Sequence, residues 1–233
     1  MLIIAHRGAS GYFEENTVES IRQAAQIGAD GVEFDVRLCN SRIVGIHDET
    51  VDRTTTGAGK LASLSLQQFK NIKTFNGERL PYMEDLLKAA RYSKIINIEM
   101  KEPDIGSIVV NTLERFRAAH QCDLTRFLLS SFERVAIEAI RDLDLGYRLG
   151  VLYKDHFNDG LEWARELGAF SIHIPFKDAQ QENVKRAQSY GLKVYCYTVN
   201  SRANAEYCKK IGVDGIFSDL LKEVLTCKQL NPA

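Results

Sequence analysis

The chain lacks an excess of charge of either sign. Its 233 residues carry 30 Lys and Arg against 31 Asp and Glu, which gives a formal net charge of −1. Proteins that bind nucleic acid need a clear basic excess to neutralise phosphates, so the composition argues against nucleic acid as a partner. Apolar residues make up 45% and charged residues 26% of the chain. This balance is typical of a globular protein and excludes a disordered or fibrous one.

Cysteine and long apolar runs are also scarce. The five cysteines are widely spaced and form no Cys-x-x-Cys pair, so neither a disulfide framework nor a zinc site is indicated. Such cysteines are typical of free thiols in a reducing compartment. The apolar run after Met1 is too short for a signal peptide, and no run approaches the ~18–20 residues of a membrane span. We therefore expect a cytoplasmic protein without stable membrane insertion.

Short β-rich runs alternate with segments whose apolar residues recur at helical spacing. Eight such runs in a chain of this length predict an α/β fold, the TIM (β/α)8 barrel, which typically has ~250 residues. An open doubly wound sheet is the rival architecture, but no Gly-x-Gly-x-x-Gly follows the first run. The predicted strands are Leu2–His6, Gly31–Val36, Ile95–Met100, Arg126–Ser130, Tyr147–Leu152, Ser171–Ile174, Lys193–Val199 and Gly215–Ser218.

Proline is rare, and no linker divides the chain. The four prolines are scattered, so we expect a single domain over residues 1–233. The stretch from about residue 48 to residue 80 departs from the alternation, with only a weak helical signal near Leu66–Ile72. We interpret it as a small insertion after the second strand, over one end of the barrel. Ile27–Gly31 and Ile211–Gly215 share a pattern whose first glycine suits the left-handed position after a helix.

Acidic residues alternate with apolar ones in two predicted strands. Glu33 and Asp35 lie in the second strand, and Glu99 lies in the third. On a surface strand they would face water, but the strands of a parallel barrel have no such face. The carboxylates are therefore predicted inside, near the strand ends where barrel active sites form. Three converging carboxylates repel one another unless a cation neutralises them. Oxygen ligands favour Mg²⁺ or Ca²⁺, with Mn²⁺ as a further candidate.

Two histidines are predicted beside these carboxylates. His6 ends the first strand, where a histidine on its own is more typical of a core residue. A hairpin is predicted around Asn40–Ser41, with a register that sets His47 opposite Asp35 and so on the same face. Near pH 7 one imidazole can accept a proton from the nucleophile while the other protonates the leaving alkoxide. We favour His6 as the base and His47 as the acid, and we interpret His173 as structural.

Two cations and one further acid complete the candidate site. Arg7 follows His6, and Lys101 follows the third strand, so both can neutralise phosphate oxygens. A metal, two histidines and two cations form an arrangement suited to phosphoryl transfer. Glu15 precedes Asn16–Thr17, where a helix cap is expected. Glu15 is also a candidate contact for a histidine or a substrate hydroxyl.

Taken together, the motifs resemble the glycerophosphodiester phosphodiesterase family in its compact bacterial type. The resemblance extends over nearly the whole chain, and its specificity comes from the ordered set rather than from any one motif. The motifs are His6-Arg7-Gly8, Glu15-Asn16-Thr17, Glu33-Phe34-Asp35-Val36, His47-Asp48, Asp52-Arg53-Thr54-Thr55, Asn97-Ile98-Glu99-Met100-Lys101, Ser130-Ser131-Phe132, Tyr197-Thr198-Val199-Asn200 and Asp214-Gly215-Ile216-Phe217-Ser218-Asp219.

The resemblance implies a TIM barrel that hydrolyses glycerophosphodiesters, the deacylated phospholipid headgroups, to glycerol 3-phosphate and an alcohol. It also implies a divalent metal on Glu33, Asp35 and Glu99, with His6 and His47 as the acid–base pair. The nucleophile is either water or the 2-hydroxyl of the substrate.

The chain departs from the family pattern at two positions, which bear on substrate preference. Glu14 stands where the family usually has proline, and Tyr197 stands where it usually has tryptophan, in the expected apolar wall of the pocket. Two alternatives remain open: a hydrolase of lysophospholipids or other lipid phosphodiesters on the same barrel, and a non-catalytic binding barrel. No basic amphipathic helix marks a membrane-docking surface, which disfavours the lipid hydrolase. The sequence does not fix the headgroup or the oligomeric state.

Overall fold

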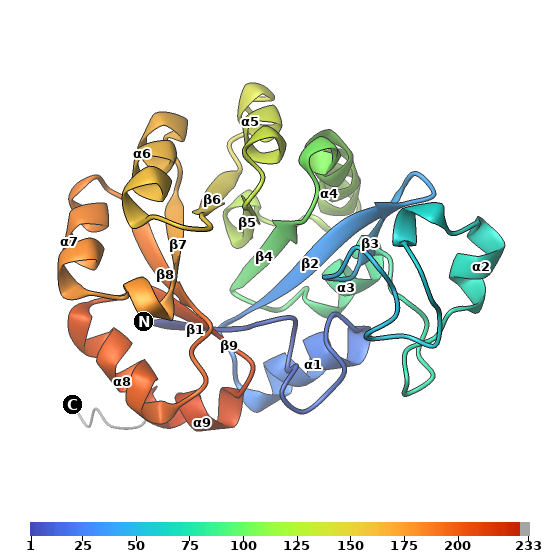
Figure 1. Ribbon diagram of the computed structural model, residues 1–233, viewed down its shortest axis with the longest axis horizontal. Coiled ribbons are helices and arrows are strands. Elements are labelled where there is room, and N and C mark those ends of the chain that lie inside the picture. Colours follow the sequence, from blue (N-terminus) through green and yellow to red (C-terminus); the bar gives the residue numbers. More distant parts are fainter. Residues whose placement is uncertain (229–233) are drawn as a thin grey trace.

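The computed structural model describes residues 1–228, and eight of its strands close into a parallel barrel (Figure 1). The strands follow one another around the barrel in chain order, and β1 pairs with both β9 and β2. The predicted TIM (β/α)8 barrel is therefore confirmed. The barrel strands are β1 Leu2–Ala5, β2 Gly31–Cys39, β4 Ile95–Met100, β5 Phe127–Ser131, β6 Arg148–Leu152, β7 Ser171–Pro175, β8 Lys193–Tyr197 and β9 Gly215–Ser218.

A helix follows each strand or hairpin of the barrel, and these helices form the outer ring seen in Figure 1. The first begins at Val18 and is capped by Thr17, whose side chain accepts a hydrogen bond from the Ser20 backbone N–H while the Ser20 side chain accepts one from the Thr17 backbone N–H. Gly28 and Gly212 end their helices with φ of 106° and 87°, the left-handed geometry expected of them. The ring helices are α1 Val18–Ile27, α3 Met83–Ala89, α4 Gly106–His120, α5 Arg134–Asp142, α6 Phe157–Leu167, α7 Gln181–Ser189, α8 Arg202–Ile211 and α9 Leu221–Leu225.

The predicted hairpin forms, but its register differs from the prediction by one residue. β2 runs without a break into the first arm of the hairpin, and β3 (Arg42–Gly45) returns antiparallel to it. Asn40 and Ser41 have φ of 49° and 61°, so they form a two-residue turn that pairs its flanking residues directly. This register sets Ile46 rather than His47 against Asp35, with the Ile46 N–H donating to the Asp35 carbonyl over 3.2 Å. The predicted pairing was therefore wrong.

The other strand ends agree with the prediction within one or two residues, which is the ordinary uncertainty of such boundaries. The segment expected from Lys193 to Val199 ends as a strand at Tyr197. The expected domain extends to residue 233, and residues 229–233 lie outside the described part of the chain.

The expected insertion lies between β3 and α3, and it stands to one side of the helix ring with α2, Leu66–Asn71 (Figure 1). It packs on a small hydrophobic core that it shares with the β2–β3 hairpin, separate from the core between the barrel and its helices. The buried side chains of this core are Cys39, Val44, Ile46, Val51, Leu61, Phe69, Ile72 and Leu80. The segment that follows His47 is therefore held by packing and is not an unsupported loop.

The inside of the barrel is divided between apolar and polar side chains. A cluster that includes Ile4, Ile95, Leu128, Tyr195 and Phe217 fills one part of it. Because alternate residues of a strand share a face, Ile95 places Asn97 and Glu99 of β4 on the same inward side. The barrel interior is therefore apolar in one part and becomes polar toward the carboxyl ends of the strands. In the described part of the chain, no helix is long and apolar enough to cross a membrane.

We expect the outward face of β2 to be essential for stability. Phe34 is completely buried between the barrel and its helices, so Phe34→Ala should destabilise the protein by about 3–5 kcal/mol. Urea denaturation followed by circular dichroism measures this loss. Phe75→Ala is the matched control, because Phe75 is 65% exposed and should change the free energy of unfolding little. Equal stability of the Phe34 variant and the wild type would contradict this packing.

Candidate active site

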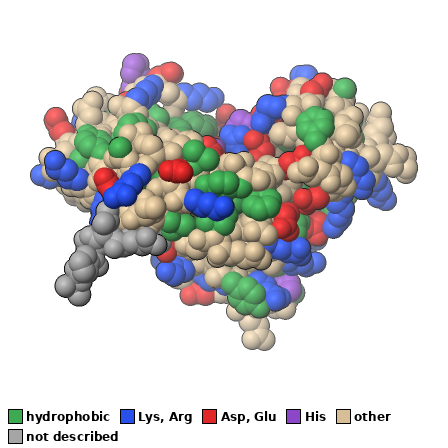
Figure 2. Space-filling model, turned by 90° about the horizontal axis from the view of Figure 1, so that it is seen from below, with side chains coloured by type: hydrophobic (Ala, Val, Ile, Leu, Met, Phe, Trp, Pro, Cys, Tyr) green, Lys and Arg blue, Asp and Glu red, His purple; other side chains and the backbone are tan. Residues whose placement is uncertain are grey.

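A cavity of about 230 Å³ opens at the carboxyl ends of the barrel strands. Figure 2 shows the molecule hollowed between the barrel and the lobe on the right, with acidic, basic and histidine side chains gathered in the notch. Eight of the nine predicted site residues line the cavity, and Glu15 lies at a small crevice that also borders His47. The cavity is lined by His6, Arg7, Glu33, Asp35, His47, Glu99, Lys101, Phe132, Leu152, His173, Tyr197, Thr198 and Phe217.

Three carboxylates converge on one wall of this cavity. Asp35 of β2 pairs in register with Glu99 of β4, and Glu33 lies two residues earlier on the same face. One oxygen of each lies within 4.8 Å of the others, and all three residues are buried. Burial and the neighbouring charge of Asp35 raise the pKa of Glu33 to about 8. The same two causes raise the pKa of Glu99.

The carboxylate cluster fits a hard divalent cation. Glu33 Oε1 is buried without a hydrogen-bond partner, which is costly for a charged oxygen unless another ligand occupies that position. The donors are all carboxylate oxygens, the ligands that Mg²⁺ and Ca²⁺ prefer. No His or Cys belongs to the cluster, so zinc and other metals that favour nitrogen or sulfur are disfavoured.

Two cations lie against the carboxylates. Lys101 Nζ lies 2.6 Å from Glu99 Oε1 and 3.6 Å from Asp35 Oδ1, and Arg7 Nε lies 3.2 Å from Asp35 Oδ2. Burial opposes the ionisation of Asp35, but these two cations outweigh it and lower the pKa of Asp35. The Arg7 backbone N–H also donates to Glu33 Oε2 over 2.7 Å. Asp35 is therefore the member of the cluster whose pKa these contacts lower, whereas the pKa values of Glu33 and Glu99 are raised.

Two of the three histidines that line the cavity, His6 and His47, are each fixed by a carboxylate. His6 Nδ1 lies 2.7 Å from Asp219 Oδ1, and His47 Nδ1 lies 2.6 Å from Asp48 Oδ1. A carboxylate only accepts hydrogen bonds, so Nδ1 carries the proton in both rings and leaves Nε2 for chemistry. Burial opposes the charge of His6, but the hydrogen bond to Asp219 and the charge of Glu33 outweigh it and raise its pKa.

Glu15 contacts arginines and neither histidine. Its Oε1 accepts a hydrogen bond from Arg7 Nη1 over 3.0 Å, and both of its oxygens accept from Arg53. Burial opposes the ionisation of Glu15, but the two arginines prevail and lower its pKa. The sequence left two contacts open for Glu15, a histidine or a substrate hydroxyl. The side-chain contacts observed for Glu15 are with Arg7 and Arg53, so the expected contact with a histidine does not form.

Aromatic and apolar side chains also line the cavity. Tyr197 meets Phe132 edge to face, with ring centroids 6.2 Å apart, and Leu152 and Phe217 extend this surface. His173 is fully buried, lies 3.1 Å from Ser171 Oγ through Nε2, and has its pKa lowered to about 3 by burial. Because it stays neutral near pH 7, His173 contributes a polar but uncharged surface to the cavity.

Several residues of the site had no assigned role in the sequence prediction beyond their place in a motif. Asn16 was expected only as a helix cap, yet its Nδ2 donates to Asp35 Oδ2 over 2.9 Å and its Oδ1 accepts from the Asp35 backbone. Asp219 orients His6, and Asn200 in turn donates to Asp219 Oδ2 over 2.7 Å. The available signal for Asp219 and Asn200 was their placement directly after predicted strands, where a barrel collects its functional groups, whereas Asn16 follows its strand by ten residues and had no such signal.

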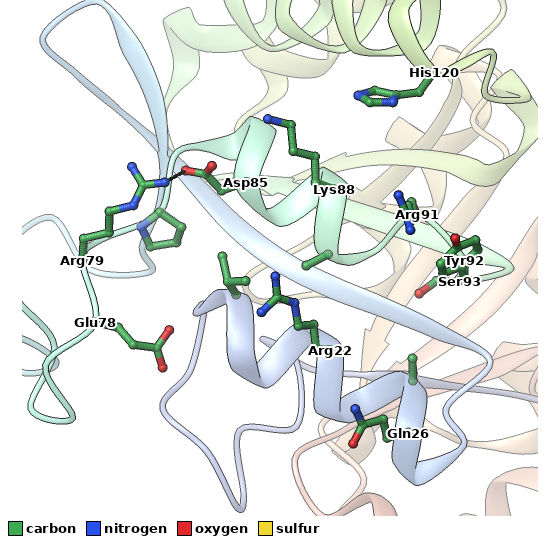
Figure 3. A pocket seen from close by; sticks show the side chains of 14 residues that line it. Arg22, Gln26, Glu78, Arg79, Asp85, Lys88, Arg91, Tyr92, Ser93 and His120 are labelled. Carbon is green, nitrogen blue, oxygen red and sulfur yellow. Dashed lines mark hydrogen bonds and ion pairs between the residues drawn. The ribbon is translucent and has the colours of Figure 1, made fainter.

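A larger concavity of about 800 Å³ lies outside the barrel, between α1 and α3 (Figure 3). Arg22 reaches from α1 toward α3, Lys88 and Arg91 line the same surface, and Arg79 forms an ion pair with Asp85. No cluster of three metal-ligating side chains lies here among the described residues. This outer groove therefore lacks the converging acids and histidines that distinguish the inner cavity.

Comparisons with known proteins agree with this geometry. A family model described as "Glycerophosphoryl diester phosphodiesterase family" matches residues 6–223. A glycerophosphodiester phosphodiesterase of Caldanaerobacter subterraneus is 30% identical over 232 residues, which cover 94% of this chain and 93% of that protein. One of Bacillus altitudinis is 30% identical over 234 residues, which cover 93% and 94%.

A solved structure is also similar over nearly its full length. It is a phosphodiesterase of Oleispira antarctica in complex with the product sn-glycerol-3-phosphate. The TM-score is 0.89 at 25% identity, and the match covers 98% of this chain and 97% of that one.

The raised pKa of Glu33 predicts a pH-dependent stability in the absence of divalent ions. Protonated Glu33 stabilises the fold below its ordinary titration range, and this contribution is lost as the pH rises through about 8. In chelator, Glu33→Gln should therefore melt at a higher temperature than the wild type at pH 9, and the difference should shrink at pH 6. Glu182→Gln, on the exposed side of α7, is the control. A difference independent of pH would contradict the prediction.

Proposed function

Because the chain belongs to the glycerophosphoryl diester phosphodiesterase family, we propose that it hydrolyses glycerophosphodiesters with a divalent cation and a pair of histidines. The products are glycerol 3-phosphate and an alcohol. The observation that carries the proposal is the convergence of three buried carboxylates, two carboxylate-anchored histidines and two cations on one cavity. The product bound to the similar Oleispira antarctica enzyme supports the substrate class.

Glu33, Asp35 and Glu99 hold the cation in this proposal, and Mg²⁺ or Ca²⁺ suits their oxygens. When bound, the cation supplies Lewis-acid polarisation of a phosphoryl oxygen. Asn16 holds Asp35 from both its amide atoms, so the orientation of this carboxylate does not depend on the cation. The ligands are thereby pre-organised on neighbouring strands.

Arg7 and Lys101 bind the nonbridging phosphate oxygens. A guanidinium has five N–H donors, and the side-chain contacts to Asp35 and Glu15 leave donors of Arg7 for a phosphate. Lys101 lies within the cavity wall and holds a positive charge beside the carboxylates. Both cations stabilise the extra negative charge that develops at phosphorus as the nucleophile attacks in line.

His6 and His47 move the protons. His6 accepts the proton of the nucleophile, and His47 donates a proton to the leaving alkoxide. Water as the nucleophile gives glycerol 3-phosphate directly, whereas the substrate 2-hydroxyl gives a cyclic phosphate that water then opens to glycerol 3-phosphate. Asp219 and Asp48 fix the tautomer of each ring, as the third member of a catalytic triad does. The apolar wall around Phe132 and Tyr197 supports the carbon skeleton of the substrate and limits water at that side.

We expect activity to depend on the carboxylate cluster and on an added divalent ion. The wild type should release glycerol 3-phosphate from glycerophosphocholine when Mg²⁺, Ca²⁺ or Mn²⁺ is present, and not after exhaustive chelation. Glu99→Gln should lose orders of magnitude in kcat, because it removes one charged ligand. A coupled enzymatic assay for glycerol 3-phosphate measures this.

The same assay separates the alternatives. Faster turnover of lysophosphatidylcholine than of glycerophosphocholine would favour a lipid phosphodiesterase. Binding without turnover of any glycerophosphodiester would favour a binding barrel. Full activity in chelator would contradict metal dependence.

The roles of the two histidines predict different responses to the leaving group. His47→Ala should lose about 10²–10⁴-fold in kcat on glycerophosphocholine, yet far less on the p-nitrophenyl ester of glycerol 3-phosphate, which leaves without a proton. His6→Ala should lose activity on both substrates. His156→Ala, on the exposed N-terminal side of α6, serves as the control. The reverse pattern would exchange the roles, and equal losses for His47→Ala on both substrates would contradict its assignment as the acid.

A further inference from the structure

A continuous series of charged contacts joins the carboxylate cluster to His47. It crosses two loops that are far apart in the sequence, the β1–α1 loop and the insertion. Each neighbouring pair in the series lies within 3.2 Å. In order, its members are Asp35, Arg7, Glu15, Arg53, Asp48 and His47.

Arg53 occupies the junction of this series. Its Nε donates to Asp48 Oδ2 over 2.5 Å, while Nη1 and Nη2 donate to the two oxygens of Glu15 over 2.9 and 2.7 Å. The contact with Glu15 is the two-pronged arrangement in which arginine is most directional. One guanidinium thus bridges the carboxylate that orients His47 and the carboxylate that orients Arg7.

The insertion presents Arg53 to this junction through a fixed turn. Thr55 is buried, its hydroxyl donates to the Val51 carbonyl over 2.6 Å, and it accepts from the Gly57 N–H over 3.1 Å. Thr55 also bridges to Thr74 across the insertion. Arg53 therefore projects from a segment held by its own hydrogen bonds and by the small core of the insertion.

Arg53 is placed to position other groups rather than to bind substrate. It does not line the cavity, whereas Arg7, Lys101 and His47 do. Its three nitrogens are all engaged by carboxylates in the observed contacts. The charged groups near His47 are Asp48 and Arg53 on the insertion side, with Asp35 and Arg37 on β2.

We propose that Arg53 is a positioning residue that locks the Asp48–His47 pair to the Glu15–Arg7 pair. The histidine from the insertion and the arginine from the barrel then reach the same phosphate in one fixed geometry. The inference rests on the proposed function, because it assumes that His47 and Arg7 act on that phosphate. A displacement of about 1 Å in such a group can cost ~10²-fold in rate.

Arg53→Ala tests the inference against a matched arginine. Its kcat on glycerophosphocholine should fall about 10²-fold, while KM stays near the wild-type value because Arg53 does not touch substrate. Arg42→Ala is the control. The Arg42 side chain has the same exposed fraction, 48%, and pairs with Glu84 away from the cavity. It should keep wild-type kcat and KM.

Two further measurements distinguish positioning from a general loss of structure. Added guanidinium ion should restore part of the kcat of Arg53→Ala, and Arg53→Lys should retain more activity than Arg53→Ala. In a double-mutant cycle, removing Arg53 should cost less in an Asp48→Ala background than in the wild type, because the two side chains act through one contact.

The outcomes separate this inference from the proposed function. Wild-type kcat in Arg53→Ala, a loss confined to KM, or additive losses in the cycle would overturn the positioning role while the wild type stays active. Absence of glycerol 3-phosphate release by the wild type would instead overturn the proposed function.

Discussion

The repulsion among three buried carboxylates is the constraint on which the rest of the site depends. Glu33, Asp35 and Glu99 are brought together by strand register, since β2 and β4 are adjacent and pair Asp35 with Glu99. Water cannot screen these charges in the barrel interior, so the protein must supply compensation. Lys101 and the Arg7 side chain balance part of the charge, while burial and the charge of Asp35 raise the pKa of Glu33. A divalent cation would complete this balance.

Acidic and basic side chains alternate outward from the carboxylate cluster, and each one contacts a neighbour of opposite charge. Arg7 forms an ion pair with Glu15, and Glu15 forms a second ion pair with Arg53. His6 and His47 are each held by an acid at Nδ1, one directly after the last barrel strand and one at the start of the insertion. The carboxylates thus fix the orientation of these cationic and histidine side chains as well as balancing their charge.

The alternation of strands and helices predicted the barrel. Parallel strands are buried on both faces of the sheet, so each one appears in the sequence as a short apolar run. The acidic positions of β2 and β4 stood out for the same reason, since a polar residue inside such a strand has no solvent to face. The hairpin register was wrong by one residue, because a two-residue turn at Asn40–Ser41 and a three-residue turn look alike in sequence. The contact of His6 with Asp219 spans 213 residues, and the contacts of Arg53 cross two loops. No local pattern encodes such distances, so these partners emerge only from the fold.

The insertion and the hairpin that leads into it share a small core separate from that of the barrel, so His6 and His47 lie in differently packed parts of the molecule. His6 is anchored on the central barrel, whose packing is shared by all eight strands. His47 begins a segment whose cohesion comes from a handful of side chains around Leu61, Phe69 and Leu80. Cooperative units of different size open with different free energies. Evolution can therefore remodel the insertion, and with it the position of His47 at the cavity, while the strands that carry the carboxylates remain unchanged.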